Sequence, residues 1–294
     1  MQLLNANKLT IAKWLQLFKA PDRSSSQEWV ETNVVVGNNI SPAMPGDVRM
    51  SKTPWMIFVL DCLDDPSIKI IVGQKSAQIG WSFATLIAWL GKKICIDQQN
   101  IMIAFPTDPL IVKFWKEKFV PFINSTPVVK AIIGDVKRQK ISYKHIPIGS
   151  NFIAMANMRT PTDLISSSVE TIIVEEPGQV QDDVGKQGDT FDIISQRMKT
   201  IENSKFVYAG TPTKADFCPV EKAFKKSNQL HFQVICHLCG AFHPLSFENL
   251  KYKAWNDRRI DKLYGLYDPS TACYECPHCN TAWSFDEKNE NVLK

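Results

Sequence analysis

The sequence has no long hydrophobic run, since no apolar stretch reaches the roughly 18 residues that a membrane-spanning helix needs. The amino-terminal segment MQLLNANKLTIAKW also lacks the basic region, apolar stretch and small-residue cleavage site of a secretory signal. Both absences favour a protein of the cell interior. There is little excess of charge of either sign: the net charge of +4 permits nucleic-acid binding without arguing for it. Hydrophobic residues make up 44% of the chain, enough for one substantial core.

Cysteine is sparse before residue 236, and five of the eight cysteines lie between residues 236 and 279. Inside a cell such a late cluster indicates a metal site rather than disulfides. Two C-x-x-C pairs, with 36 residues between them, supply the four ligands that tetrahedral zinc requires: Cys236, Cys239, Cys276 and Cys279. Gly240 and Asn280 follow the two pairs and tolerate the left-handed turn of a zinc knuckle. We expect a structural zinc ribbon, because four cysteines leave no open position for catalysis.

Other readings of the cluster stay open at this stage. Cys273 forms a third possible C-x-x-C pair with Cys276, and three histidines are alternative ligands: His237, His243 and His278. A reduced hairpin without metal is also compatible with the spacing.

Strand and helix patterns alternate through the middle of the chain. Short apolar, β-branched runs occupy residues 68–73, 101–106, 151–156, 171–174 and 206–209. Helical patterns occupy residues 55–63, 82–92, 108–123, 191–201 and 219–226. This alternation predicts an α/β fold with a mainly parallel sheet and helices on both faces. We divide the chain into a lead-in segment (1–50) with a short helix at 7–19 and loops at 20–54, an α/β domain (51–230), and a cysteine-containing subdomain (231–294).

A phosphate-binding loop is the first candidate site. The strand before Gly73 is followed by Gln-Lys75-Ser-Ala-Gln-Ile-Gly80-Trp-Ser82 and then a helix. Such a loop directs backbone N–H groups and the positive helix end at one point, which suits a triphosphate. The common pattern is G-x-x-x-x-G-K-[ST], but here Trp81 stands at the lysine position and Lys75 stands five residues before Gly80. Lys75 would contact the phosphates and Ser82 would bind Mg²⁺. An ordinary strand–turn–helix with a surface lysine is the alternative.

Two further strand ends complete the pattern. The run 171–176 is a predicted buried strand that ends in Glu175 and Glu176, at the edge where open α/β sheets bind ligands. Because adjacent strand residues face opposite sides, Glu175 would support magnesium through water while Glu176 polarises the attacking water as general base. A strand end that merely becomes polar at the surface is the alternative. The next strand ends in a small and hydroxyl-rich motif: Gly210, Thr211, Pro212 and Thr213.

Together these segments resemble the lambda-type family of phage terminase large subunits. The matching pieces run in order over roughly residues 28–285. They are Ser41-Pro…Pro45-Gly-Asp-Val-Arg49, Thr53-Pro-Trp…Asp61-Cys-Leu, Lys75-Ser-Ala-Gln-Ile-Gly80, Phe105-Pro-Thr107, Glu175-Glu176, Gln187-Gly-Asp189, Arg197, Gly210-Thr-Pro-Thr213 and Cys236-His-Leu-Cys239. The shifted position of Lys75 is common in this family, so it is the most specific of these features.

The resemblance implies a P-loop ATPase of the additional-strand type that hydrolyses ATP with Mg²⁺ and pushes double-stranded DNA into a viral prohead. It implies a homo-oligomeric ring, a small terminase subunit and the portal protein as partners, and work in the host cell cytoplasm. It assigns the nucleotide to Lys75, Ser76, Ala77, Gln78, Ile79, Gly80, Trp81 and Ser82, and coupling of hydrolysis to movement to residues 210–213. The family's nuclease domain is not expected within these residues.

Three further expectations follow. Trp55 is a candidate for stacking on adenine or a core tryptophan. Arg159 and Arg197 are candidates for the arginine that a neighbouring subunit inserts, with a structural or solvent-facing role as the alternative. Two basic stretches are candidate DNA contacts or solvated faces: Lys222, Lys225 and Lys226, and Lys137, Arg138, Lys140 and Lys144. A zinc-ribbon interaction fragment that binds nucleotide with little turnover is the second functional reading. A helicase is disfavoured because no second phosphate loop is present.

Overall fold

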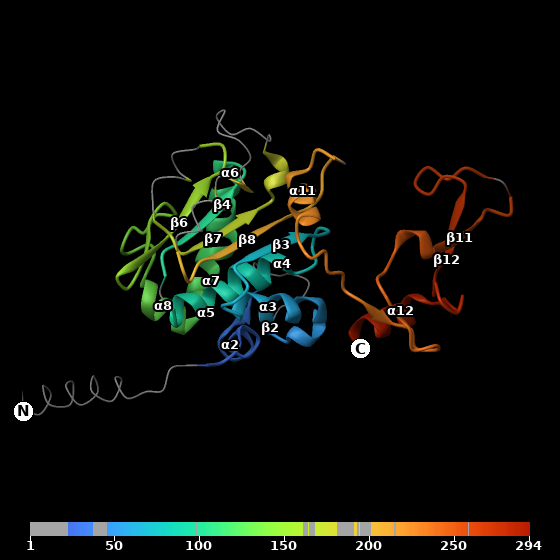
Figure 1. Ribbon diagram of the computed structural model, residues 1–294, viewed down its shortest axis with the longest axis horizontal. Helices are drawn as coiled ribbons and strands as arrows, with labels where there is room; N and C mark the ends of the chain where they lie inside the picture. Colours follow the sequence, from blue (N-terminus) through green and yellow to red (C-terminus); the bar gives the residue numbers. More distant parts are fainter. Residues whose placement is uncertain are drawn as a thin grey trace, which may run out of the picture.

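The structure, a computed structural model, describes residues 23–37, 46–97, 99–160, 164, 168–180, 191–192, 194, 201–214, 216–257 and 259–294. The expected helix at 7–19, the loop 187–189, Arg197 and most of the expected helix at 191–201 lie outside these residues. Figure 1 shows an α/β body followed by a smaller carboxy-terminal part. This smaller part contains five of the eight cysteines. In the described part of the chain, no helix is long and apolar enough to cross a membrane.

A six-stranded sheet forms the centre of the α/β body, in the order β3-β8-β7-β4-β6-β5. Its strands are β3 (Ile70–Gln74), β4 (Ile101–Phe105), β5 (Ile146–Ile148), β6 (Asn151–Asn157), β7 (Thr171–Glu175) and β8 (Lys205–Gly210). Neighbouring strands pair in parallel except β5, which is antiparallel to β6. The predicted α/β class with a mainly parallel sheet is therefore confirmed.

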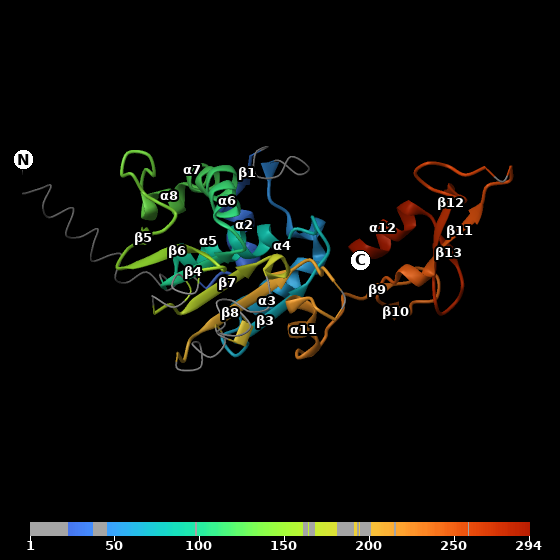
Figure 2. The ribbon, with the colours of Figure 1, turned by 90° about the horizontal axis from the view of Figure 1, so that it is seen from above.

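The sheet is buried on both faces because successive side chains of its central strands enter different cores. In β4, Ile101 and Ile103 belong to one buried cluster, while Met102 and Ala104 belong to the other. The first cluster includes α6 (Asp108–Phe114) and α7 (Val120–Ser125), and the second includes α11 (Pro219–Lys225). Figure 2 shows α6 and α7 on one side of the sheet and α11 on the other.

The remaining helices of the body surround this sheet. They are α2 (Ser26–Asn33), α3 (Ile57–Asp64), α4 (Trp81–Phe83), α5 (Leu90–Cys95) and α8 (Pro127–Ile133). Two π-helical segments, Ala84–Trp89 and Trp115–Phe119, join α4 to α5 and α6 to α7, so each predicted helix is continuous. Single 3-10 turns cover Met50–Lys52, Pro54–Met56 and Pro177–Gln179, and β1 (Val35–Val36) pairs with β2 (Gly46–Asp47).

The expectation of loops throughout residues 20–54 is wrong, because α2 lies within that segment. Ser25 accepts a hydrogen bond from the Glu28 backbone N–H, and the Glu28 carboxylate accepts one from the Ser25 N–H. This capping box starts the helix within a serine-rich sequence that otherwise suggests a loop. Trp29 and Val30 then bury against the main core. The lead-in segment thus contributes to the same core as the sheet.

The carboxy-terminal part consists of short antiparallel hairpins around a small core. Its elements are β9 (Val234–Ile235), β10 (Phe242–His243), a 3-10 turn (Phe247–Asn249), β11 (Leu250–Ala254), β12 (Tyr267–Glu275), β13 (Ala282–Trp283) and α12 (Phe285–Leu293). Among the described residues, its buried cluster contains only Val234, Cys236, Tyr274, Cys276 and Trp283. Because so few apolar residues give little folding free energy, we expect a further source of stability.

Candidate functional site

The loop between β3 and α4, residues 75–80, lies at the carboxyl edge of the sheet and is the candidate phosphate loop. Gly80, its last residue, has φ +86° and precedes the first turn of the helix. Glycine adopts this left-handed conformation without a Cβ penalty, so the chain can turn into the helix here. Residues 76–78 are exposed, and Gln78 is also left-handed at φ +60°. The loop backbone is therefore accessible to an anionic ligand at the start of a continuous helix over residues 81–95.

Trp81, at the position where such loops usually carry lysine, points into the protein. Its side chain is 6% exposed, and its ring packs so closely on Gly73 that a Cβ there would come within 2.5 Å of it. Trp81 can therefore offer a ligand only its backbone N–H. The structure leaves Lys75 as the cation of this loop.

Lys75 and Glu176 meet although 101 residues separate them. The Lys75 Nζ lies 2.5 Å from Glu176 Oε1, and the two side chains are 8% and 28% exposed. The other carboxylate oxygen of Glu176 accepts a hydrogen bond from the Thr211 backbone N–H at 2.9 Å. Glu176 therefore connects the phosphate loop with the hydroxyl-rich end of β8. Its backbone is left-handed (φ +54°), an uncommon conformation for a residue other than glycine and one that is concentrated at functional sites.

Glu175 points to the opposite side of β7 and is buried. Its carboxylate accepts hydrogen bonds from the Ser82 hydroxyl at 3.2 Å and from the Thr85 hydroxyl at 3.4 Å. Burial raises the pKa of Glu175 to about 7, although the charge of Lys75 acts in the opposite direction. A hydroxyl and a carboxylate from different elements thus converge at the first turn of the helix. Mg²⁺ prefers such oxygen ligands and often keeps water between itself and a carboxylate, so these residues fit a magnesium site.

Gly210, at the end of β8, packs closely against Glu176 and Pro177, which follow β7. A Cβ at Gly210 would lie 3.1 Å from the Glu176 Cα and 3.1 Å from the Pro177 Cδ, so only glycine fits without displacing them. The Gly210 carbonyl accepts a hydrogen bond from the Lys75 N–H at 3.2 Å. The three sequence motifs therefore meet at one edge of the sheet.

The remaining predicted site residues are placed as follows. The Trp55 indole N–H donates to the carbonyl oxygen of Ile79 at 2.8 Å, so Trp55 supports the phosphate loop, and its ring meets Phe232 edge-on at 6.2 Å. Arg159 is exposed, and its guanidinium donates to the Gln179 carbonyl at 3.4 Å. Its fellow candidate, Arg197, lies outside the described residues.

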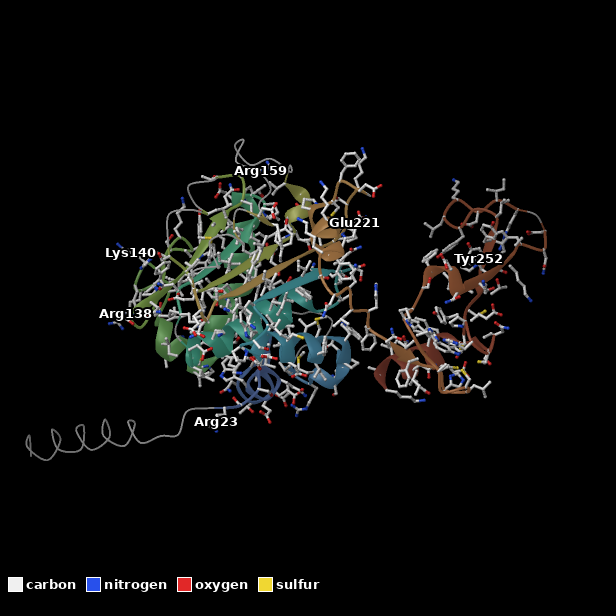
Figure 3. All side chains as sticks on the ribbon, in the orientation of Figure 1. Arg23, Arg138, Lys140, Arg159, Glu221 and Tyr252 are labelled. Carbon is white, nitrogen blue, oxygen red and sulfur yellow. The ribbon has the colours of Figure 1, made fainter. Side chains whose placement is uncertain are left out.

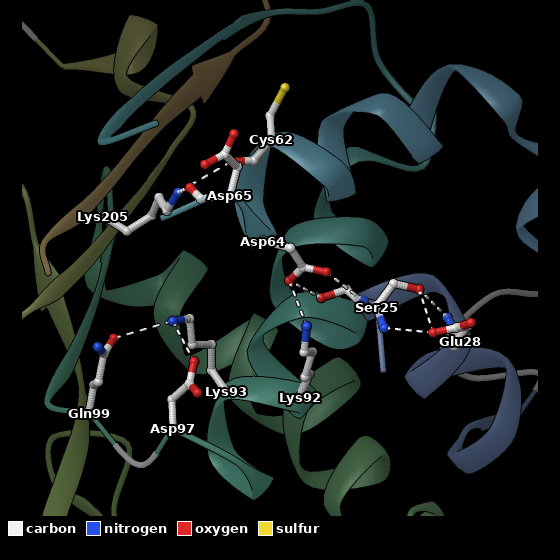
Figure 4. A network of polar contacts seen from close by, with 11 residues as sticks. Ser25, Glu28, Cys62, Asp64, Asp65, Lys92, Lys93, Asp97, Gln99 and Lys205 are labelled. Carbon is white, nitrogen blue, oxygen red and sulfur yellow. Dashed lines mark hydrogen bonds and ion pairs between the residues drawn. The ribbon is translucent and has the colours of Figure 1, made fainter. Parts of the chain in front are cut away.

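Sequence reasoning missed Lys205, the first residue of β8. Its buried ammonium donates to the carbonyl oxygens of Cys62, Asp65 and Ile68, at and beyond the carboxyl end of α3. Figure 4 shows Lys205 reaching this helix end beside Asp65. Burial lowers the pKa of Lys205 to about 8. A lone lysine before an apolar run gave no signal of this role, because its acceptors are backbone atoms about 140 residues away.

The four predicted cysteines of the carboxy-terminal part come together. Their sulfur atoms all lie within 4.8 Å of one another, with Cys236–Cys279 at 3.8 Å and Cys239–Cys276 at 3.9 Å. Four sulfurs about 2.3 Å from a common zinc ion in a tetrahedron would lie roughly 3.8 Å apart, so the arrangement fits zinc. Cys273 lies on β12, opposite Lys251, and is not a member of this group.

The two knuckles share one turn geometry. In the first, the N–H of Gly240 (φ +71°) donates to the Cys236 carbonyl, and in the second the N–H of Asn280 (φ +58°) donates to the Cys276 carbonyl. The left-handed conformations expected for both residues are confirmed.

Comparisons with known proteins identify the family of the chain. The family described as "Phage terminase large subunit gpA, ATPase domain" matches residues 42–294. A search of curated proteins found no match. Among solved structures, the large terminase of bacteriophage HK97 is similar at 15% identity with a TM-score of 0.46, over 81% of this chain and 45% of that chain. The chain thus spans less than half the length of that terminase. Because the family match covers most of its residues, the chain belongs to the phage terminase large subunits of the gpA family, in the ATPase domain.

Proposed function

We propose that this chain is an ATP-hydrolysing motor that drives double-stranded DNA into a viral prohead. The observation that carries the proposal is the contact between Lys75 and Glu176, with Glu175 and Ser82 beside it. It joins a phosphate-loop cation to a carboxylate placed to act as a base. Membership of the terminase ATPase family favours turnover over the reading as a nucleotide-binding fragment with little activity.

In the proposed reaction the phosphates of ATP compete with Glu176 for Lys75. The lysine ammonium holds the Glu176 carboxylate when no nucleotide is present, and the triphosphate offers it a more highly charged partner. Transfer of Lys75 to the phosphates frees one oxygen of Glu176 to accept a proton from the attacking water. The Thr211 N–H keeps the other oxygen in place, so the carboxylate stays oriented while its first partner leaves.

Ser82 and Glu175 would hold the magnesium that accompanies ATP. The bound ion supplies charge stabilisation for the phosphoryl oxygens. The Ser82 hydroxyl is exposed at the first helical turn, and Glu175 lies behind it in a site that favours the protonated acid. Positive charge near Glu175 would restore its ionised form, and its hydrogen bonds from Ser82 and Thr85 fix where the carboxylate points.

The order of the strands supports the additional-strand type of P-loop ATPase. β8 lies between β3, which carries the phosphate loop, and β7, which carries the acidic pair. Its end, residues 210–213, therefore touches both, through Gly210 to Lys75 and through Thr211 to Glu176. We propose that this segment senses the γ-phosphate and couples hydrolysis to movement.

The cysteine group is proposed to bind a structural zinc ion, because its sulfur spacing fits a tetrahedral site and its core is small. The proposed partners are a small terminase subunit, the portal protein and further copies of this chain in a ring, with the host cytoplasm as the place of work. Trp55 is proposed to support the nucleotide site, and Arg159 and Arg197 remain candidates for a residue acting in a neighbouring subunit.

Steady-state ATP hydrolysis by the purified chain, with and without duplex DNA, tests this proposal. Lys75→Ala should abolish both ATP binding and turnover, whereas Glu176→Gln should lower turnover by roughly 10²- to 10⁴-fold without abolishing ATP binding. Lys69→Ala is the matched control, since Lys69 is a lysine of the same region outside the loop. Turnover that persists in both variants would refute the assigned site. Absence of ATP binding in the wild-type chain would refute the phosphate-loop assignment.

A further inference from the structure

The two basic stretches of the sequence differ in how their charges are balanced. Lys225, the last residue of α11, lies 2.7 Å from Glu221 and 3.6 Å from Asp216, and the next residue, Lys226, lies 3.9 Å from Asp192. Both lysines therefore have carboxylates within ion-pair distance. By contrast, within the described residues no carboxylate lies within ion-pair distance of the cations between α8 and β5: Lys137, Arg138, Lys140 and Lys144.

We call residues 134–145 the basic turn. Its four cations and its single carboxylate, Asp135, give it a net charge of +3 with His145 neutral. All four cationic residues are exposed. Figure 3 shows Arg138 and Lys140 together at one extremity of the molecule, far from Glu221 of α11.

Backbone contacts fix the shape of the basic turn. The carbonyl oxygens of Asp135, Val136 and Lys137 accept hydrogen bonds from the N–H groups of Gln139, Ile141 and Lys140 at 3.0, 3.0 and 3.3 Å. The Asp135 carboxylate accepts the Arg138 backbone N–H at 2.8 Å, so this acid serves the turn itself.

A buried side chain and a backbone hydrogen bond anchor the turn to the body. Val136 is buried at 8% exposure, and the Tyr143 carbonyl accepts the Met155 N–H of β6 at 2.9 Å. Gly134 (φ +87°) lies against the side chain of Gln139, which would approach an added Cβ to 2.6 Å. The cations therefore stand on a preformed support, and ordering it on binding costs little entropy.

We propose that the basic turn binds the phosphate backbone of duplex DNA, and that α11 does not. Exposed cations without a carboxylate partner displace the counterions condensed on DNA when they meet its phosphates, whereas Lys225 and Lys226 would first have to leave the carboxylates beside them. Contacts of this kind hold the backbone without reading sequence. The choice of duplex DNA as the partner rests on the proposed function, but the contact itself does not require ATP turnover.

Two variants that remove the same number of charges test the proposal. One replaces Lys137, Arg138 and Lys140 with glutamine, and the other replaces Lys222, Lys225 and Lys226. Binding of the full chain to two 30-base-pair duplexes of unrelated sequence is measured between about 50 and 200 mM salt, together with ATP turnover without DNA and self-association by analytical ultracentrifugation.

The basic-turn variant should bind at least tenfold more weakly near 0.1 M salt, equally on both duplexes. Its slope of log K against log salt should become shallower by up to about 2.7, or roughly 0.9 for each phosphate that the variant no longer neutralises. The α11 variant should stay within twofold of the wild type. Basal ATP turnover should be unchanged in both variants, because neither touches the nucleotide site.

Two outcomes would overturn the proposal. The first is unchanged DNA binding by the basic-turn variant, and a loss of self-association in that case would make the turn a protein contact. The second is an equal loss of DNA binding in both variants, which would reflect net charge alone. A chain that binds DNA through the turn but has no ATP turnover would instead refute the proposed function and leave this inference standing.

Discussion

Glu176→Gln should change nucleotide binding and turnover in opposite directions. The lysine that would grip the phosphates is held at 2.5 Å by the carboxylate that would act as base, and the Lys75 ammonium is only 8% exposed. ATP must displace this contact when it binds. Replacing the carboxylate with an amide of nearly the same shape weakens the competitor and also removes the base.

The magnitude follows from the two kinds of hydrogen bond. A hydrogen bond that involves a charged group contributes about 1.5–3 kcal/mol. Lys75 stays charged, so the amide introduced by Glu176→Gln would keep the hydrogen bond but lose the opposite charge, and the competitor weakens by on the order of 1 kcal/mol. ATP should then bind roughly fivefold more tightly. Loss of a general base should lower turnover by roughly 10²- to 10⁴-fold.

Isothermal titration calorimetry and single-turnover hydrolysis measure the two effects on one sample. Glu221→Gln is the matched control, because Glu221 pairs with Lys225 at 2.7 Å on α11, in a motif not assigned to the nucleotide. It should leave both quantities unchanged. If Glu176→Gln weakens ATP binding, the carboxylate does not compete for Lys75. If it leaves hydrolysis intact, the base lies elsewhere.

Three other predictions concern different parts of the molecule. Burial raises the pKa of Glu175 to about 7 from an ordinary value of 4.5. The nucleotide-free fold should therefore lose up to about 3 kcal/mol of its free energy of unfolding as the pH rises from below 4.5 through 7. Urea unfolding measures this loss, and Glu175→Gln should not show it. Removing zinc with a chelator should unfold the part around Trp283 and expose four thiols to a thiol reagent while the α/β body keeps its circular dichroism; no metal in the purified chain would contradict this. Trp55→Phe keeps an aromatic ring but removes the hydrogen bond to Ile79, so ATP should bind about fivefold more weakly in calorimetry, whereas an unchanged affinity would show that the loop needs no such support.

The sheet was predictable because its strands are continuous apolar runs. β4 and β7 are buried at every position, and such runs between helical patterns favour a parallel sheet. The turns at the two C-x-x-C pairs were also predictable, because a cysteine pair followed by Gly240 or Asn280 specifies a local left-handed turn. Parallel strands also place their carboxyl ends at one edge of the sheet. Lys75 and Glu176 each follow such a strand end, so their proximity could be predicted from the sequence motifs.

The features that the sequence did not predict depend on contacts with residues distant in the chain, or on residue types that are common both in loops and at helix ends. The capping box of α2 was hidden among serines that also suggest a loop. The inward turn of Trp81 depends on the space above Gly73, which belongs to a different element. The difference between the two basic stretches depends on which acids fold beside them, and spacing alone cannot show that.

The anchoring of Lys205 has a mechanical consequence for the proposed motor. Strand β8 is tied at its first residue to the carboxyl end of α3 and held along its length by β3 and β7. These contacts oppose sliding of the strand relative to its neighbours. In the proposed motor we therefore expect movement to arise beyond Gly210, in the segment that connects β8 to α11. The length of that connection would then limit how far one hydrolysis event moves the parts that follow it.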